Sequence, residues 1–325
     1  MLKYCDSPFS TIHIEQKGEV HLCLCTPWHT KGKIGNIYDT GLRELWNSKW
    51  MQDFRSTIYD QSFKYCNPDS CWKVNNLDEI ETFKDLDIPK LPTIIYLQDL
   101  DDNCNLKCPS CRLSLRYKDT TNPEVDKLLS HLTDVYQDFD RPVYISADGS
   151  GEFFSSRSYL NFLQNDTLPK HFNFYINTNG TLINKNIDLI EKRKDKIKSL
   201  TFSLDAATPE TYHRIRGHNF ATVISGIKKV KALGINVVAQ FVVQQENYKE
   251  ITQYQDLCKD LGVDFVGLQG LNRWEHHSNE WWEANRLEDN TLVDLHLLSE
   301  QIIKFKQADN VSVGGNIEAL IRNSQ

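Results

Sequence analysis

The feature that most constrains the fold is a regular alternation of short apolar runs and amphipathic stretches from Leu91 onward. The apolar runs are rich in Ile, Val, Phe and Tyr, which is typical of buried strands, and the stretches between them have helical periodicity. We expect strands at residues 94–100, 143–147, 173–177, 199–204, 236–243 and 265–268. We expect helices at residues 124–136, 156–165, 187–198, 220–233, 249–261 and 292–306. This alternation predicts α/β units around a parallel sheet.

The number of units predicts the architecture. Eight right-handed βα units would close a barrel, whereas six form an open one. We therefore expect a partial (β/α)6 barrel over residues 91–272, with a C-terminal extension, residues 273–325, covering it. In such folds the chemistry lies on loops that leave the carboxyl ends of the strands.

Residues 1–90 have a different character, with short strands expected at 11–15 and 20–24 and an acidic linker at 77–92. Eight of the nine cysteines fall between Cys5 and Cys111, which indicates metal binding. Disulfides are less expected, because the start of the chain lacks the features of a signal peptide. We expect a small cysteine-rich domain here and a cytoplasmic protein.

Charge and hydropathy argue against two classes of partner. The formal net charge is −7, which gives no general attraction for nucleic acid or for an anionic membrane. No apolar run approaches the roughly 20 residues that a membrane-spanning helix needs. We therefore expect neither a nucleic-acid partner nor a membrane.

A CxxxCxxC sequence formed by Cys104, Cys108 and Cys111 follows the first expected strand of the α/β region. Three thiolates on one loop can hold a [4Fe–4S] cluster and leave its fourth iron without a protein ligand. That iron can chelate the amino and carboxylate groups of S-adenosylmethionine. A structural zinc knuckle or three buried thiols are the alternatives, but no fourth ligand stands at suitable spacing after Cys111.

Strand, cysteine loop and successive βα units together resemble the radical S-adenosylmethionine (radical SAM) superfamily. The resemblance implies cofactor contacts on the loops after the second, third and fourth strands, where single residues could otherwise be helix caps or surface ion pairs. One of Arg214 and Arg216 could clamp the cofactor carboxylate. The implied cofactor-binding residues are Gly149, Gly151, Glu152, Asn179, Ser203, Asp205, Arg214 and Arg216.

A second cysteine set consists of Cys5, Cys23, Cys66 and Cys71. With Gly18 and the residues around Trp46 it resembles the auxiliary-cluster domain of the SPASM and twitch type. The resemblance implies one auxiliary [4Fe–4S] cluster, and a structural zinc with the same sulfurs is the alternative. Cys25 is then spare, or it competes with Cys23.

Two further features have open interpretations. Cys258 is either a small core residue or a hydrogen-atom donor. His276 and His277 follow the last expected strand and either act as acid–base groups or belong to a loop that packs Trp281 and Trp282 over the barrel.

The predicted function is enzymatic. Reductive cleavage of S-adenosylmethionine would yield a radical that removes a hydrogen atom from an organic substrate, for the oxidation or epimerisation of a sugar-like small molecule or a peptide. An oxidoreductase of this kind needs an electron donor such as flavodoxin or ferredoxin. The alternative is a non-catalytic iron–sulfur or zinc scaffold that binds a partner.

Overall fold

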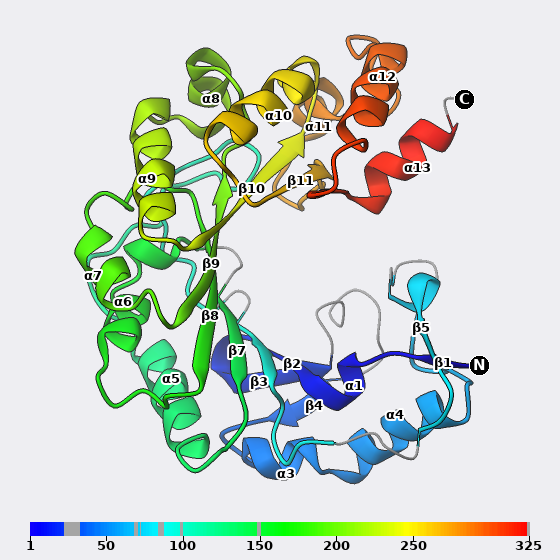
Figure 1. Ribbon diagram of the computed structural model, residues 1–325, viewed down its shortest axis with the longest axis vertical. Helices are drawn as coiled ribbons and strands as arrows, with labels where there is room; N and C mark the ends of the chain where they lie inside the picture. Colours follow the sequence, from blue (N-terminus) through cyan, green and yellow to red (C-terminus); the bar gives the residue numbers. More distant parts are fainter. Residues whose placement is uncertain are drawn as a thin grey trace. The chain divides into compact units, whose positions relative to one another are not determined.

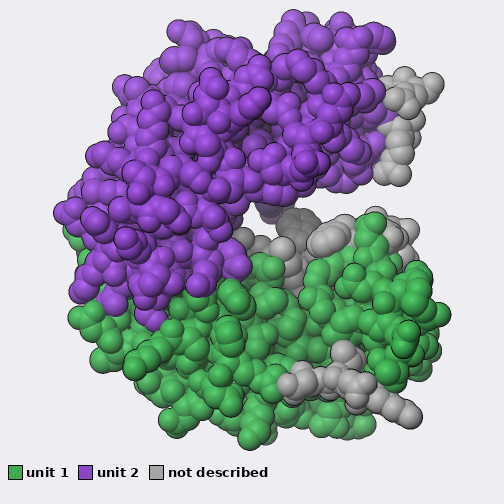
Figure 2. Space-filling view, in the orientation of Figure 1, with its two compact units in different colours: residues 1–102, 120–151, 157–174 green, residues 103–119, 152–156, 175–325 purple. Residues whose placement is uncertain are grey.

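The chain separates into two compact units (Figure 2). Unit 1 comprises residues 1–102, 120–151 and 157–174, and unit 2 comprises residues 103–119, 152–156 and 175–325. The computed structural model describes residues 1–22, 33–67, 71, 73–83, 88–97, 100–147 and 151–323.

Unit 2 is built on four parallel strands in the order β12-β11-β10-β9. They are β9 (Ile197–Ser203), β10 (Asn236–Val243), β11 (Phe265–Gly270) and β12 (Val311–Val313). In β10 every second residue is buried, from Val237 to Val243, so one face carries the core. Helices α9 (Phe220–Ala232) and α10 (Ile251–Asp260) lie along the outer side of these strands (Figure 1).

The remaining helices of unit 2 follow the strands in the manner of βα units. They are α7 (Ile187–Lys192), α8 (Pro209–Arg216), α11 (Asn279–Asn285), α12 (Leu295–Phe305) and α13 (Gly315–Asn323), with short 3-10 turns η3 (Phe153–Ser155) and η4 (Tyr248–Glu250). Thr208 caps α8 by accepting from the Thr211 amide, and Gly217 ends it in a left-handed conformation, with φ 67°. Glu250, at the end of the η4 turn after β10, accepts from the Ala207 amide at 2.8 Å and from Thr208 Oγ1 at 2.9 Å, which joins it to the segment after β9.

In unit 1 the strands run both parallel and antiparallel to their neighbours. Their order is β7-β6-β2-β3-β4, where β7, β6 and β2 are parallel and β2, β3 and β4 are antiparallel. The strands are β2 (Thr11–Ile14), β3 (Glu19–Leu22), β4 (Lys33–Asn36), β6 (Ile94–Tyr96) and β7 (Val143–Ala147). The cysteine-rich segment is therefore paired strand to strand with the start of the α/β region.

The other elements of unit 1 are a separate two-stranded ribbon and a set of helices. The ribbon pairs β1 (Leu2–Tyr4) with β5 (Asp78–Ile80). The helices are α1 (Ser7–Ser10), α3 (Leu42–Trp46), α4 (Lys49–Tyr59), α5 (Pro123–Val135) and α6 (Arg157–Gln164), with 3-10 turns η1 (Gln16–Gly18) and η2 (Val74–Asn76). Strand β8 (Phe172–Thr178) begins in unit 1 and ends in unit 2.

Helix α4 anchors the beginning of the chain. Its Arg55 donates to the Pro8 carbonyl at 2.9 Å and stacks over Trp46, with 4.4 Å from Cζ to the ring centroid. Ile58 packs in a cluster with Cys5 and Phe9. These contacts hold Cys5 in a buried position.

The α/β class with parallel βα units is confirmed. The expected helix at 187–198 is shorter, because α7 ends at Lys192 and a turn brings the chain into β9 at Ile197. The expected linker contains β5, which pairs with β1. Within the described residues no helix has the length and apolar character needed to cross a membrane. The domain boundaries at residues 90 and 272 stay a prediction.

Candidate functional site

The loop that carries the first cysteine set lies in unit 2 and is closed at its base. The Asn103 side chain donates to the Lys118 carbonyl at 2.6 Å and accepts from the Lys118 amide at 3.3 Å. Inside this loop Cys104 and Cys108 are buried against Leu106, whereas Cys111 is exposed. The structure therefore brings two of the three thiols into the interior and leaves the third at the surface.

Two guanidinium groups lie against these sulfurs. Arg112 Nη2 is 3.5 Å from Cys111 Sγ, and Arg216 Nη1 is 3.7 Å from Cys108 Sγ. Burial raises the pKa of the Cys104 thiol to about 11, and the charge of Arg112 opposes that rise. Metal binding requires the thiolate form, so binding here releases protons, and neighbouring cations favour it.

The donor set suits an iron–sulfur cluster. None of the described cysteines forms a disulfide, so the thiols of Cys104, Cys108 and Cys111 are free to bind metal. Three thiolates and the sulfides of a cluster carry a net negative charge, which Arg112 and Arg216 offset.

The turn after β8 is tied to the cysteine loop. Asn179 Nδ2 donates to Asn105 Oδ1 at 3.0 Å and approaches Cys104 Sγ to 4.0 Å. Asn105 in turn donates to Thr181 Oγ1 at 2.8 Å. These side-chain bonds fix Cys104 relative to the end of β8.

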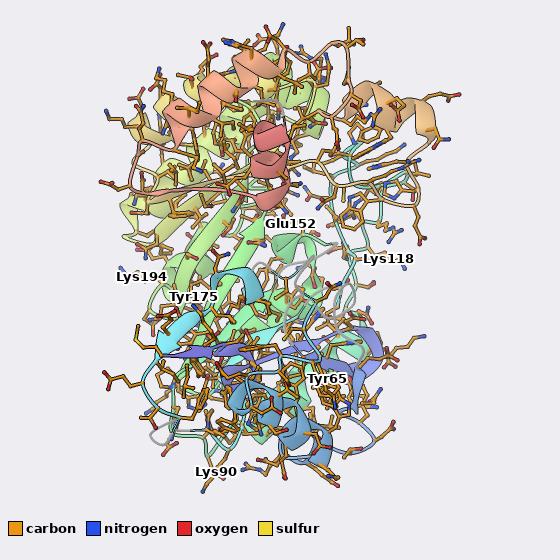
Figure 3. All side chains as sticks on the ribbon, turned by 90° about the vertical axis from the view of Figure 1, so that its right-hand side faces the viewer. Tyr65, Lys90, Lys118, Glu152, Tyr175 and Lys194 are labelled. Carbon is orange, nitrogen blue, oxygen red and sulfur yellow. The ribbon has the colours of Figure 1, made fainter. Side chains whose placement is uncertain are left out.

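Glu152, labelled in Figure 3, organises the same turn from a buried position. Its carboxylate accepts from Thr178 Oγ1 at 2.7 Å, from the Asn179 amide at 2.5 Å and from the Phe154 amide at 3.1 Å. Burial raises the pKa of Glu152, and these three hydrogen bonds lower it, with a net rise. The carboxylate is thus committed to holding the turn.

Asp205 and Arg216 form a buried ion pair at the ends of β9 and α8. Asp205 has a positive φ of 53°, and its Oδ1 accepts from the Val242 amide at 2.7 Å. Arg214 points elsewhere: its side chain is half-exposed and pairs with Glu246. The structure therefore places Arg216, and not Arg214, beside the cysteine sulfurs.

Three further residues were predicted to bind the cofactor. Ser203 is half-buried at the end of β9, and Gly151 lies in unit 1. Gly149 lies outside the described residues. The cofactor contacts of all eight residues stay predictions.

Sequence reasoning missed Asn105, Arg112 and Thr181. Asn105 and Arg112 directly follow Cys104 and Cys111 in the sequence, and that position was the available signal. Thr181 had no such signal, because its role depends on the approach of two loops.

The auxiliary set is partly described, in unit 1. Burial raises the pKa of Cys66 to about 12, and the nearby thiols of Cys5 and Cys71 raise it as well. Lys73 lies beside them, where it donates to Asp6 Oδ1 at 2.6 Å and counters the effect of burial on Cys5. Cys23 and Cys25 lie outside the described residues. Three of the four predicted ligands therefore lie close enough for their charges to interact.

Cys258 and His277, whose roles the sequence leaves open, both have buried side chains. Cys258 is buried in α10 next to Tyr254. His277 is buried, accepts from the Trp274 amide at 3.2 Å and packs on Trp281 with 4.1 Å between ring centroids. Burial lowers the pKa of His277, which keeps its ring neutral near pH 7.

Two family models match this chain. The model described as "Radical SAM superfamily" matches residues 101–258, and the SPASM model, described as "Iron-sulfur cluster-binding domain", matches residues 5–72. Two curated relatives come from Methanosarcina barkeri. The AdoMet-dependent heme synthase is 26% identical over 51% of this chain and 47% of its own. The Fe-coproporphyrin III synthase is 26% identical over 64% of this chain and 51% of its own.

The chain spans about half the length of these curated relatives. Among solved structures, Streptococcus suis SuiB bound to S-adenosylmethionine superposes with a TM-score of 0.52 and 19% identity, over 82% of this chain and 55% of that one. This likeness shows the fold alone. The two family models, and not this likeness, show the family. They match a SPASM-type iron–sulfur domain ahead of a radical SAM domain, whose cofactors are a [4Fe–4S] cluster and S-adenosylmethionine. The chain belongs to the radical SAM superfamily.

Proposed function

We propose that the protein is an oxidoreductase that cleaves S-adenosylmethionine reductively and removes a hydrogen atom from an organic substrate. When bound, the cluster supplies one electron to S-adenosylmethionine, which splits into methionine and a 5′-deoxyadenosyl radical. The observation that carries this proposal is the cysteine loop itself. Its three thiols lie on one closed loop, flanked by Arg112 and Arg216 and tied through Asn105 to Asn179.

In this proposal the side chains of unit 2 have distinct tasks. Cys104, Cys108 and Cys111 hold the cluster, and the two guanidinium groups offset its charge. Asp205 acts as a positioning residue, because its carboxylate holds the Arg216 guanidinium at the sulfurs.

The residues proposed to contact the cofactor end strands or follow them closely in the sequence. Asn179 directly follows β8 and Ser203 ends the neighbouring strand β9, where polar groups can reach the cofactor's ribose. Glu152 accepts from the Asn179 amide and so holds that turn, and Gly149 and Gly151 belong to the glycine-rich segment directly before Glu152 in the sequence.

For the substrate we propose a sugar-like small molecule or a peptide, modified by oxidation or epimerisation. The curated relatives are named as synthases of heme and of Fe-coproporphyrin III, and those names concern the relatives. An auxiliary cluster at Cys5, Cys66 and Cys71 could accept the electron that a substrate radical releases on oxidation. A flavodoxin or a ferredoxin would deliver the electron that starts the reaction.

The test is anaerobic turnover. The chain is reconstituted with iron and sulfide, given dithionite and S-adenosylmethionine, and assayed for 5′-deoxyadenosine. Replacing Cys104, Cys108 and Cys111 together by Ala should abolish the product and leave the auxiliary iron in place. Cys258→Ala is the matched control, because that thiol lies in α10 and outside both cysteine sets. Absence of product from the intact chain would favour the non-catalytic scaffold. Product from the triple variant would refute the assignment of Cys104, Cys108 and Cys111 as the cluster ligands.

A further inference from the structure

The hairpin of β2 and β3 carries on one face four side chains, two histidines and two glutamates, of types that commonly bind metal ions. His13 and His21 face each other across the antiparallel pair. Glu15 and Glu19 lie two residues from them toward the turn, so all four share one side of the pleat. The Glu15 amide donates to the Glu19 carbonyl at 2.8 Å, which closes the hairpin directly at the two acidic residues.

Three of these groups lie at distances that a small coordination site could draw together, and the fourth, His13, lies near Glu15. Glu15 lies between the two imidazoles: its Oε2 is 3.5 Å from His21 Nε2, and its Oε1 is 4.0 Å from His13 Nδ1. Ligand atoms of Glu15, Glu19 and His21 all lie within 4.8 Å of one another. Tetrahedral zinc with bonds of about 2.0–2.2 Å separates its donors by roughly 3.3 Å, so a small inward shift of the side chains suffices.

His13 is the observation that points to a ligand. Its side chain is only 1% exposed, and neither ring nitrogen has a hydrogen-bond partner among the described residues. Burial lowers the pKa of His13 to about 4, and His21 lowers it as well, so the ring is neutral near pH 7. A neutral imidazole keeps a nitrogen lone pair, and leaving it buried and unpaired is costly. A bound cation would remove that cost.

The backbone that presents this face is well fixed. Asn36 Nδ2 donates to the Lys17 carbonyl at 2.8 Å, and Gly18 adopts a φ of 76°. A Cβ at Gly18 would come within 2.8 Å of the Tyr38 ring, so the turn packs closely against the segment after β4. A preformed hairpin places its donors before the ion arrives, which favours binding.

We propose that His13, Glu15, Glu19 and His21 form a binding site for a divalent transition-metal ion, of which Zn²⁺ suits the donor set best. Two imidazole nitrogens and two carboxylate oxygens are zinc ligands, and four protein donors make a closed, structural site. The site uses no sulfur and is therefore separate in chemistry from both cysteine sets. A bound ion would link β2 to β3 and so stabilise the hairpin that directly precedes Cys23 in the sequence.

Cobalt serves as the probe, because Co²⁺ occupies zinc sites and reports its ligands by visible absorption. The intact chain, with its iron–sulfur clusters reconstituted so that cluster cysteines are occupied, is titrated anaerobically with Co²⁺. Bound cobalt and iron are then measured by elemental analysis. We expect about one cobalt ion per chain beyond the clusters, with a ligand-field spectrum that lacks thiolate charge transfer.

Three variants and a matched control decide the outcome. Glu15→Gln, His21→Gln and His13→Gln should each weaken cobalt binding about tenfold or more and leave the iron content unchanged. His296→Gln is the control, since His296 is exposed and also lies near a glutamate, 3.7 Å from Glu300. Glu15 is partly exposed, so Glu15→Gln keeps the test valid if His13→Gln fails to fold. Equal cobalt binding by wild type, Glu15→Gln and His21→Gln would overturn the proposal, as would a thiolate band in the cobalt spectrum.

Discussion

Arg216 lies against Cys108: its Nη1 is 3.7 Å from the Cys108 sulfur, and its backbone carbonyl is 3.9 Å from the same atom. Asp205 holds the other end of the guanidinium. A cation in this position stabilises added negative charge, which is what reduction of a cluster brings.

Arg216→Gln should therefore shift the reduction potential of the radical SAM cluster to more negative values. We expect 5′-deoxyadenosine formation to fall at least about tenfold. The variant also leaves the Asp205 carboxylate buried without its partner, at a cost of about 3 kcal/mol in the free energy of unfolding. Electron paramagnetic resonance during a redox titration measures the potential, and denaturant unfolding measures the stability.

Arg214→Gln is the control for this prediction, because Arg214 lies on the same helix but pairs with Glu246 near solvent. Loss of that pair should cost under about 1 kcal/mol and leave the potential unchanged. If Arg214→Gln moved the potential as far as Arg216→Gln does, a direct action of Arg216 on the cluster would be refuted.

The raised pKa of Glu152 predicts how the free energy of unfolding depends on pH. Burial raises its pKa in the folded chain above the ordinary value of 4.5, so the folded state takes up a proton more readily than the unfolded state. The stability that protonated Glu152 contributes is fully present below pH 4.5 and is lost as the pH rises through the folded pKa. Relative to Glu152→Gln, the wild type should therefore gain stability on acidification from pH 7.

Urea unfolding of both chains across this pH range gives the difference directly. At pH 7 the Gln variant should also show the loss of an acceptor for the Asn179 amide, which costs about 1–3 kcal/mol. A wild type that loses stability relative to the variant on acidification would mean that the three hydrogen bonds outweigh burial.

Arg214 and Arg216 also show how much of the site could be predicted from the sequence. The run of βα units and the cysteine loop were predictable, because alternation of strand and helix patterns is local information. Arg214 and Arg216 are two residues apart on a helix, and at about 100° per residue they lie on nearly opposite faces. The sequence alone indicates that only one can reach the cofactor, but the choice depends on how α8 packs on its neighbours.

Contacts between distant loops could not be predicted for a related reason. Asn105 and Asn179 are 74 positions apart, and their hydrogen bond requires the register of several strands to be known first. The β1–β5 ribbon was missed because three-residue strands carry too short a pattern to separate them from a linker.

Cys66 gives a prediction for the auxiliary site. Cys66→Ala removes one of three described thiols that lie close together, so the iron content should fall by about four atoms per chain. Cys258→Ala, which removes a buried thiol elsewhere, should keep the full iron content. Iron and zinc are measured in parallel on anaerobically purified protein. Zinc lost from Cys66→Ala in place of iron would assign a structural zinc to the auxiliary cysteines.

Comparing Gly180 with Gly234 separates the cost of backbone strain from the cost of close packing. Both have positive φ, 78° and 76°, so a side chain at either position is strained and costs about 1 kcal/mol. At Gly180 a Cβ would also meet Val223 Cγ1 at 2.7 Å and Phe202 Cδ1 at 2.8 Å, whereas at Gly234 nothing lies within 4 Å. Gly180→Ala must therefore push the Asn179 turn away from β9, at a further cost of about 1–3 kcal/mol.

That displacement gives the two variants different functional signatures. The Asn179 turn is bonded to Asn105 beside Cys104, so Gly180→Ala should weaken S-adenosylmethionine binding as well as stability. Gly234→Ala changes only the turn between α9 and β10 and should affect stability alone. Equilibrium binding of S-adenosylmethionine to the reconstituted, unreduced proteins measures this without turnover. Equal binding by the two variants, at their different stabilities, would show that the turn can move without disturbing the cofactor site and would argue against a cofactor contact at Asn179.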